Sequence, residues 1–165
     1  MIKLAIVGTG HVAHWHAQSF KKINGVEIVG ACDIDENRVK KFAKEYNIPQ
    51  TYTSFEDLIS NCELDAITNA TPDSFHKEIA LKAISKNKHI FSEKPLAENY
   101  SDAKEMYDAV KDTNLINIVN FSYRNSSGYQ ELVKVVQSGQ IGKVKHIDAT
   151  YYQSWLTCKY WGDWK

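Results

Sequence analysis

Cysteine is scarce in this sequence, and the few cysteines present form no recognisable pair. Cys32, Cys62 and Cys158 are odd in number, lie far apart and make no CxxC motif. Disulfide frameworks use even numbers of cysteines, and structural zinc sites use closely spaced ones. The pattern therefore argues against both and favours a reducing compartment, so we expect a cytoplasmic protein.

Long apolar runs and an excess of one charge are also missing. No stretch approaches the roughly 20 apolar residues of a membrane span, and the N-terminus lacks the basic region and apolar core of a signal peptide. The 20 basic residues are balanced by 20 acidic ones. We therefore expect a soluble protein that binds neither nucleic acid nor a membrane surface.

What the sequence does contain is a glycine turn directly after a short apolar run. Residues 4–7 are all apolar, which is typical of a strand buried on both faces of a parallel sheet. Gly8, Gly10 and Ala13 then match the pattern G-x-G-x-x-G/A, which allows a sharp turn, a phosphate close to the backbone and tight helix–strand packing. The N–H groups from about His11 onward would face a pyrophosphate. This pattern predicts a dinucleotide site.

A carboxylate ends the next apolar run. Residues 26–32 predict a second strand, and Asp33 follows it, 23 residues after Gly10. Dinucleotide-binding folds place a carboxylate there to accept hydrogen bonds from the adenosine ribose hydroxyls. Because its charge would repel a 2′-phosphate, we expect NAD rather than NADP. The alternative is that Asp33 caps the helix that begins after it.

Strand and helix patterns alternate along the first 120 residues, with no internal repeat and no low-complexity linker. The apolar runs predict strands at residues 3–7, 26–32, 64–70, 89–92 and 116–120. Helical periodicity predicts helices at residues 11–22, 36–46, 53–59, 74–87 and 101–111. In the third of these, Ser54 and Asp57 approximate a capping box. Repeated βα units indicate an α/β fold, a doubly wound parallel (Rossmann) sheet.

Polar segments follow the later strands of this expected sheet. Residues 70–76 read Ala-Thr-Pro-Asp-Ser-Phe-His, residues 92–95 read Ser-Glu-Lys-Pro, and residues 120–124 read Asn-Phe-Ser-Tyr-Arg. Ligands of such sheets bind outside the carboxyl ends of the strands. The clustering of polar residues at one end predicts a site there.

In their order and spacing, these segments resemble the Gfo/Idh/MocA family of NAD(P)-dependent oxidoreductases. The resemblance rests on Gly-Thr-Gly-His-Val-Ala at residues 8–13, on the Ala-Thr-Pro-Asp-x-x-His segment, and above all on Glu93-Lys94-Pro95 at a strand end. Residues 138–144 are similar to the family's lead into its second domain. The resemblance implies an NAD(P)-binding Rossmann domain over residues 1–120. It also implies that residues 121–165 begin an α+β domain for substrate binding and oligomerisation.

The resemblance also implies roles for individual residues. Lys94 matches the family lysine that contacts the substrate hydroxyl and stabilises its developing negative charge; the alternative is a solvated surface lysine. Glu93 matches the glutamate near the nicotinamide ribose. The residues implied to bind the cofactor are Gly8, Thr9, Gly10, His11, Val12, Asp33, Ala70, Thr71, Pro72, His76, Glu93, Lys94 and Arg124.

Two side chains leave alternatives open, and three histidines raise the question of a metal. His76 fits a cofactor contact or a structural histidine near a helix start, and Arg124 fits a ligand contact or a surface salt bridge. His11 and His14 share a helical face, but His16 points elsewhere and no carboxylate or cysteine completes a ligand set. We therefore expect no metal.

The chain departs from the family in its length. Family members are roughly twice as long and carry the substrate pocket, with an Asp and a general-base His, in the second domain. Here no Asp-x-x-x-His segment follows Lys94, and the sequence stops at Lys165, just after an expected strand at residues 144–153. We expect a truncated form, an interrupted gene product or one piece of a larger assembly. An open strand edge and six aromatic residues near the end predict a homo-oligomer. These aromatic residues are Tyr151, Tyr152, Trp155, Tyr160, Trp161 and Trp164.

Two functions follow from these observations. The first is the cofactor half of an NAD-dependent dehydrogenase that transfers hydride to or from a sugar, polyol or related hydroxy compound, inactive alone. The second is a dinucleotide-binding module or partner subunit without catalysis of its own. A methyltransferase would explain the glycine turn and Asp33 but would leave Glu93-Lys94-Pro95 without a purpose.

Overall fold

Short apolar strands alternate with helices through the first part of the chain. The computed structural model describes residues 1–154, and the chain divides into two units, Met1–Phe121 and Ser122–Lys165. The strands are β1 (Ile2–Val7), β2 (Val26–Cys32), β3 (Gln50–Tyr52), β4 (Ala66–Asn69), β5 (His89–Ser92) and β6 (Asn117–Val119). The helices of the first unit are α1 (His11–Phe20), α2 (Glu36–Tyr46), α3 (Phe55–Asn61), α4 (His76–Ser85) and α5 (Tyr100–Val110), with a 3-10 turn η1 (Asp73–Phe75) before α4.

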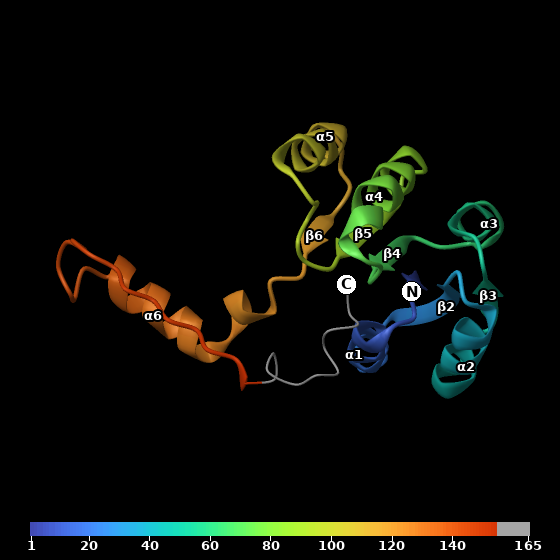
Figure 1. The fold of residues 1–165 in the computed structure, drawn as a ribbon, viewed down its shortest axis with the longest axis horizontal. Coiled ribbons are helices and arrows are strands. Elements are labelled where there is room, and N and C mark those ends of the chain that lie inside the picture. The colour runs from blue at the N-terminus through green and yellow to red at the C-terminus, as the bar shows by residue number, and fades with distance from the viewer. Residues whose placement is uncertain (155–165) are drawn as a thin grey trace. The chain divides into compact units, whose positions relative to one another are not determined.

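The six strands form one parallel sheet in the order β3-β2-β1-β4-β5-β6 (Figure 1). This is the doubly wound Rossmann order, in which the direction of winding reverses between β1 and β4. The register pairs Val7 with Asn69 and Asn69 with Ser92, so the carboxyl ends of these three strands lie level. The predicted fold class is confirmed, and the level ends define one edge where turns meet.

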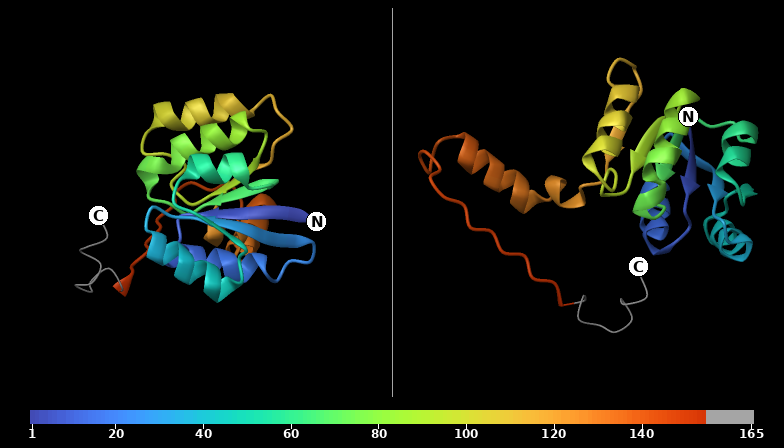
Figure 2. Two further views of the ribbon diagram at one scale, coloured as in Figure 1. Left: turned by 90° about the vertical axis from the view of Figure 1, so that its right-hand side faces the viewer. Right: turned by 45° about the horizontal axis from the view of Figure 1, so that its top comes forward.

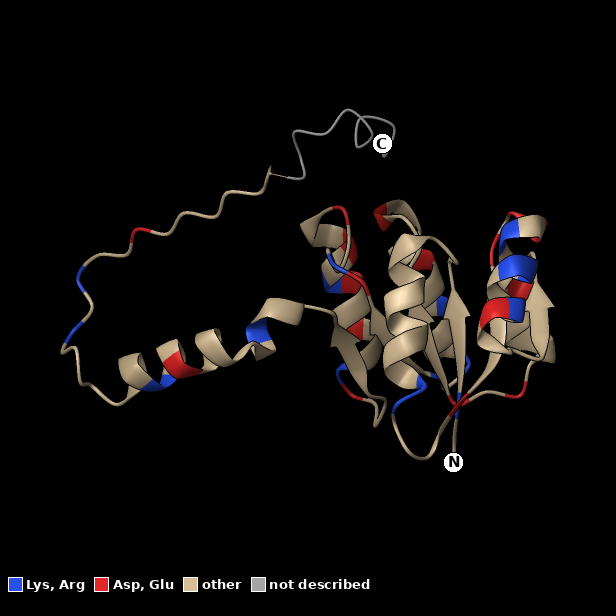
Figure 3. Ribbon diagram, turned by 90° about the horizontal axis from the view of Figure 1, so that it is seen from below, with Lys and Arg blue, Asp and Glu red and all other residues tan. Residues whose placement is uncertain are grey.

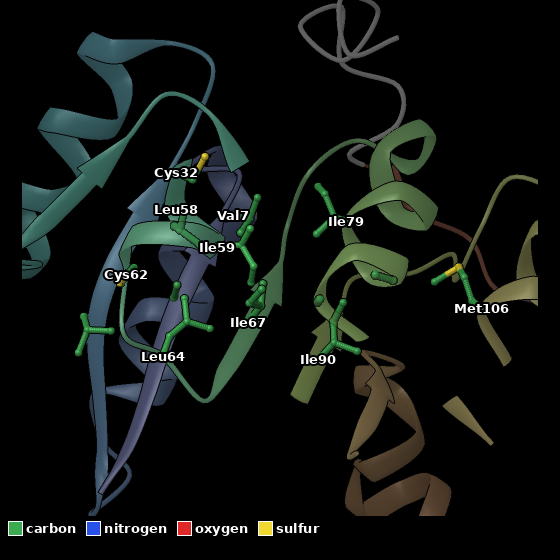
Figure 4. Packing of buried hydrophobic residues seen from close by; sticks show 14 residues of the cluster. Val7, Cys32, Leu58, Ile59, Cys62, Leu64, Ile67, Ile79, Ile90 and Met106 are labelled. Atoms are coloured by element: carbon green, nitrogen blue, oxygen red, sulfur yellow. The ribbon is translucent and has the colours of Figure 1, made fainter. Parts of the chain in front are cut away.

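Helices cover both faces of the sheet, as Figure 2 shows in its left view. Leu4 and Ile6 of β1 pack with the buried side chains of α1 and α2. Ala5 and Val7, which alternate with them, face α3, α4 and α5, and Figure 4 shows part of that second cluster. A strand with helices on both faces has no solvent side, which is why β1 is apolar without alternation. Ala13 of α1 is fully buried against the sheet, as the spacing of the glycine motif predicts.

The predicted elements differ from the structure in two places of the first unit. Strand β3 was not predicted, because it is only three residues long, polar and largely exposed. The helix predicted from residue 74 begins instead as η1, and α4 follows from His76. The Ser54 half of the predicted capping box is confirmed, since the Ser54 side chain accepts a hydrogen bond from the Asp57 N–H.

The second unit contains a 3-10 turn, η2 (Ser122–Asn125), and one helix, α6 (Ser127–Gln137). The strand predicted at residues 144–153 is wrong, because the structure assigns no strand there. An isolated strand has no ladder to join, whatever its propensity. Trp155, Cys158, Tyr160, Trp161 and Trp164 lie outside the described residues.

Helices α2, α4 and α5 carry charges of both signs, whereas α1 carries no Lys, Arg, Asp or Glu (Figure 3). In residues 1–154, none of the helices has the length and apolar character needed to cross a bilayer.

Gly8 stands where the turn after β1 meets the turn after β4. Its φ is +80°, which lies in the left-handed region that side chains rarely adopt. A Cβ at this position would lie 2.7 Å from the Ala70 carbonyl oxygen and 2.8 Å from the Thr71 nitrogen. These are backbone atoms that cannot rotate away, so the glycine is required by both conformation and space.

We therefore expect Gly8→Ala to lower the free energy of unfolding by about 2–4 kcal/mol, from backbone strain and overpacking together. Urea denaturation followed by circular dichroism measures the loss. Gly25→Ala is a matched control, because Gly25 has a φ of +86° but nothing within 4 Å of its added Cβ. Strain alone should cost Gly25→Ala about 1–2 kcal/mol. Equal losses in the two variants would contradict the close approach.

Candidate functional site

The turns that follow β1, β4, β5 and β6 lie side by side at the carboxyl edge of the sheet. Backbone hydrogen bonds join them in series: the Ala70 N–H donates to the Val7 carbonyl at 2.8 Å, and the Glu93 N–H donates to the Asn69 carbonyl at 2.8 Å. The Asn120 N–H donates to the Ser92 carbonyl at 2.8 Å. The polar segments predicted from sequence are therefore brought together along one edge.

The first of these turns leads directly into α1 without a capping side chain. Gly10 is the N-cap residue, with φ −72° and ψ −170°, and no side chain bonds to the N–H groups that open the helix. Unsatisfied N–H groups and the helix dipole attract anions at such a terminus. A Cβ at Gly10 would have nothing within 4 Å, so space lies open beside this turn. His11 and Val12, the first helical residues, are exposed.

Asp33 lies beside this turn and is almost completely buried, at 8% exposure. Its Oδ2 accepts hydrogen bonds from the Thr9 N–H at 2.8 Å and the Thr9 hydroxyl at 2.9 Å. Its Oδ1 accepts from the Asp35 N–H at 3.0 Å and lies 3.1 Å from Nη2 of Arg38. Burial by itself raises the pKa of Asp33, but these hydrogen bonds and the Arg38 charge outweigh it, so the pKa lies below its usual value.

The helix-cap alternative for Asp33 is wrong. The N-cap of α2 is Asp35, whose side chain accepts a hydrogen bond from the Arg38 N–H at 3.0 Å. Asp33 instead holds the glycine turn through Thr9.

A cavity of about 350 Å³ opens between the start of α1 and the side of α2. Its lining residues are Thr9, Gly10, His11, His14, Arg38, Lys41, Phe42 and Glu45. Two of these, Arg38 and Lys41, bring positive charge to the cavity, and Arg38 also contacts Asp33. Sequence reasoning missed both, because on α2 they look like ordinary solvated positions.

The turn after β4 is held by its own side chains and by His76. Oδ1 of Asn69 accepts from the Thr71 hydroxyl at 2.7 Å, and Pro72 precedes η1. His76 is fully buried, with Nδ1 2.7 Å from the Pro95 carbonyl oxygen and Nε2 2.9 Å from the Thr71 carbonyl oxygen. Both ring nitrogens therefore face backbone atoms, which favours the structural alternative for this side chain. His76 joins the turns that follow β4 and β5.

Glu93 lies at the centre of a polar network that is partly buried. Its Oε1 accepts from Nδ2 of Asn120 at 2.6 Å and lies 2.8 Å from Nε2 of His16, whose Nδ1 lies 2.6 Å from the Thr68 hydroxyl. Burial raises the pKa of Glu93, but the hydrogen bonds from His16 and Asn120 outweigh it, so the pKa lies below the usual value. Sequence reasoning missed His16, although Ala13, His16 and Ala17 share the sheet-facing side of α1.

Lys94 follows Glu93 and is exposed at the same edge, with a cis peptide bond to Pro95. Its side chain makes no ion pair with any residue in the described range. Arg124 is the one predicted site residue outside the first unit. It lies in η2, where its carbonyl oxygen accepts a hydrogen bond from Gln130 Nε2 at 2.6 Å.

The three histidines of α1 occupy three different environments. His11 borders the cavity, Nδ1 of His14 lies 2.9 Å from the Tyr46 hydroxyl, and His16 is buried with Glu93. No cluster of three or more potential metal ligands occurs within residues 1–154.

Comparisons with known proteins agree with this geometry. Levoglucosan dehydrogenase of Pseudarthrobacter phenanthrenivorans is 34% identical over 113 residues, which are 68% of this chain and 29% of that protein. Inositol 2-dehydrogenase of Salmonella typhimurium is 28% identical over 156 residues, which are 93% of this chain and 46% of that protein. The crystal structure of myo-inositol 2-dehydrogenase from Lactobacillus plantarum superimposes with a TM-score of 0.81 at 33% identity. That match covers 87% of this chain and 43% of the other.

The chain thus spans less than half the length of these relatives. A family model described as an oxidoreductase family with an NAD-binding Rossmann fold matches residues 2–121, which is almost the whole first unit. The chain therefore belongs to the Gfo/Idh/MocA family of oxidoreductases.

Proposed function

We propose that this chain binds NAD along the carboxyl edge of its sheet and forms the cofactor-binding part of a dehydrogenase. The observation that carries the proposal is the convergence of three features on that edge. They are the uncapped start of α1, the buried carboxylate of Asp33 and the exposed ammonium of Lys94. The open space beside Gly10 fits a pyrophosphate on the α1 N–H groups.

Each end of the cofactor has a candidate partner. Asp33 and the cavity beside Arg38 and Lys41 suit the adenosine, because a ribose offers hydroxyl donors to a carboxylate. At the other end, Glu93 and Lys94 suit the nicotinamide ribose and the reacting carbon. Thr71 and Pro72, on the turn between these ends, suit the middle of the cofactor.

The reaction we propose is hydride transfer between the nicotinamide and a hydroxyl-bearing carbon of a sugar, polyol or related compound. A bound nicotinamide supplies the hydride acceptor or donor. Lys94 would stabilise the negative charge that develops on the substrate oxygen, since an ammonium beside an alkoxide favours the ionised form. The names of the levoglucosan and inositol dehydrogenases support this class of substrate. The thiols of Cys32 and Cys62 are unpaired, which supports a reducing, cytoplasmic setting.

The first prediction concerns the choice of cofactor. NAD should bind more tightly than NADP, and Asp33→Ser should narrow the difference by about 1–2 kcal/mol. The substitution removes the repelling carboxylate and also releases Arg38, which now lies 3.1 Å from it, to meet a phosphate. Calorimetric titration of both cofactors measures the difference.

Asp35→Ser is the matched control for this change. Asp35 also lies near Arg38, at 3.8 Å, but serine can still cap α2, so the preference should stay as it is in the unmodified chain. Equal affinities for NAD and NADP in the unmodified chain would refute the role of Asp33.

The glycine turn gives the second prediction. Gly10→Val should abolish NAD binding, because its side chain would occupy the pyrophosphate position. The fold should survive, since an added Cβ meets nothing within 4 Å and the φ of −72° suits valine. Circular dichroism checks the fold and titration checks binding. Unchanged affinity in a folded variant would mean that NAD lies elsewhere.

The third prediction is that the 165-residue polypeptide by itself binds NAD but turns over no substrate. Positioning the hydroxyl carbon against the nicotinamide is worth about 7–11 kcal/mol, and a general base contributes about 10²–10⁴-fold in rate. In the described first unit the two histidines that hold the Glu93-Lys94-Pro95 turn are not available as a general base, because His16 and His76 are buried and bonded. A screen of sugars and polyols with NAD tests this, and turnover at ordinary dehydrogenase rates would contradict it.

We further propose that the polypeptide self-associates, although the predicted strand edge no longer supports this. The basis is an apolar stripe on α6 formed by Tyr129, Leu132, Val133 and Val136, which are 38–56% exposed. Leu132→Glu should reduce the mass seen by light scattering, whereas Gln137→Glu, at another exposed position of α6, should not. A clean monomer for the unmodified polypeptide would refute the association.

A further inference from the structure

We propose that His16 is a positioning residue for the reacting end of this site. Its imidazole fixes the Glu93 carboxylate and, through that carboxylate, the backbone of Lys94. The proposal rests on the proposed function in one respect, which is that Glu93 and Lys94 face the nicotinamide end of the cofactor.

His16 is held on every side that the structure describes. It is 5% exposed on the sheet-facing side of α1, with Nδ1 2.6 Å from the Thr68 hydroxyl of β4 and Nε2 2.8 Å from Oε1 of Glu93. The rings of Phe20 and Phe91 pack edge-on against it, with centroids 6.3 Å and 5.4 Å away. The imidazole therefore has one orientation available to it.

The chemistry of the partners assigns the ring protons. An ionised carboxylate only accepts hydrogen bonds, so Nε2 carries the proton that faces Glu93. In the neutral ring Nδ1 then accepts from the Thr68 hydroxyl, which can donate. When the ring is neutral, donation runs from Thr68 through His16 to Glu93, and each group orients the next.

The two carboxylate oxygens of Glu93 have different partners, Oε1 inside the protein and Oε2 at the carboxyl edge of the sheet. Oε1 takes both interior donors, His16 at 2.8 Å and Asn120 at 2.6 Å. Oε2 receives only the long bond from the Lys94 N–H, at 3.3 Å, from the part of the chain that the structure describes. Oε2 therefore keeps accepting capacity for a ligand hydroxyl, and the same carboxylate holds the Lys94 peptide.

Removing the donor at His16 should release this arrangement. A partly buried carboxylate such as Glu93 that loses a partner turns toward water or another donor, because leaving its charge unpaired away from water is costly. Both Oε2 and the Lys94 backbone would then leave their places, while Asp33 and the glycine turn, on the other side of β1, would stay. A role confined to packing would not separate the two ends of the site in this way.

The experiment compares the unmodified chain with His16→Leu, His16→Gln and Thr68→Val. His16→Gln keeps an N–H near the position of Nε2, whereas His16→Leu keeps an apolar side chain without a donor. Thr68→Val removes the hydroxyl that orients the ring. NADH and ADP are titrated into each protein, because ADP lacks the second ribose and the nicotinamide. His16→Leu should weaken NADH binding about tenfold and leave ADP binding within about twofold, while His16→Gln restores most of the loss and Thr68→Val falls between.

The backbone amide of Lys94 gives a second measurement that needs no nucleotide. In ¹H–¹⁵N spectra it should shift in His16→Leu and return toward its original position in His16→Gln. An unmoved Lys94 amide, or equal losses for NADH and ADP, would overturn the positioning role. If the unmodified chain binds no NADH while the Lys94 amide still responds to His16, the proposed function fails and the contact through Glu93 stands.

Discussion

The close approach of the turn after β1 to the turn after β4 is the constraint on which the candidate site depends. Gly8 permits it, because only a residue without Cβ fits 2.7 Å from the Ala70 carbonyl oxygen. The turn can then place Gly10 at the start of α1 and Thr9 against Asp33. A bulkier turn would move the helix terminus away from the switch point of the sheet, where this fold binds ligands. One missing side chain thus sets the position of the proposed phosphate site.

Two carboxylates, the buried Asp33 and the partly buried Glu93, then fix the ends of that site by the same physical means. Asp33 and Glu93 are each taken out of water, which alone disfavours their charge, and each is kept ionised by several donors. Asp33 bonds to the backbone and hydroxyl of the glycine turn, while Glu93 bonds to side chains from α1 and from the end of β6. A carboxylate held by several donors has little freedom to turn, so both ends are organised before any ligand arrives.

The sequence predicted most of the first unit because its signals are local. Apolar residues in short runs identify β1, β2, β4 and β5, and the glycine spacing identifies the turn. These local signals failed to predict the structure where it depends on residues distant in the sequence. Strand β3 is polar and exists only by pairing with β2, and residues 144–153 have strand-like composition but no partner strand. The role of His16 was not predicted for the same reason, since it is set by Thr68 and Glu93, which are 52 and 77 residues away.

His16 and His76 together show why the Glu93–Lys94–Pro95 turn is better defined than its exposure suggests. His16 holds the turn from the α1 side through the Glu93 carboxylate, and His76 holds it from the α4 side through the Pro95 carbonyl. Lys94 lies between the two anchored residues, so its Cα is fixed while its long side chain stays free to reach a ligand. A mobile ammonium on a fixed backbone suits the role proposed for Lys94, in which the ammonium follows a reacting oxygen. The fold thus positions the backbone of Lys94 and leaves its ammonium free to move.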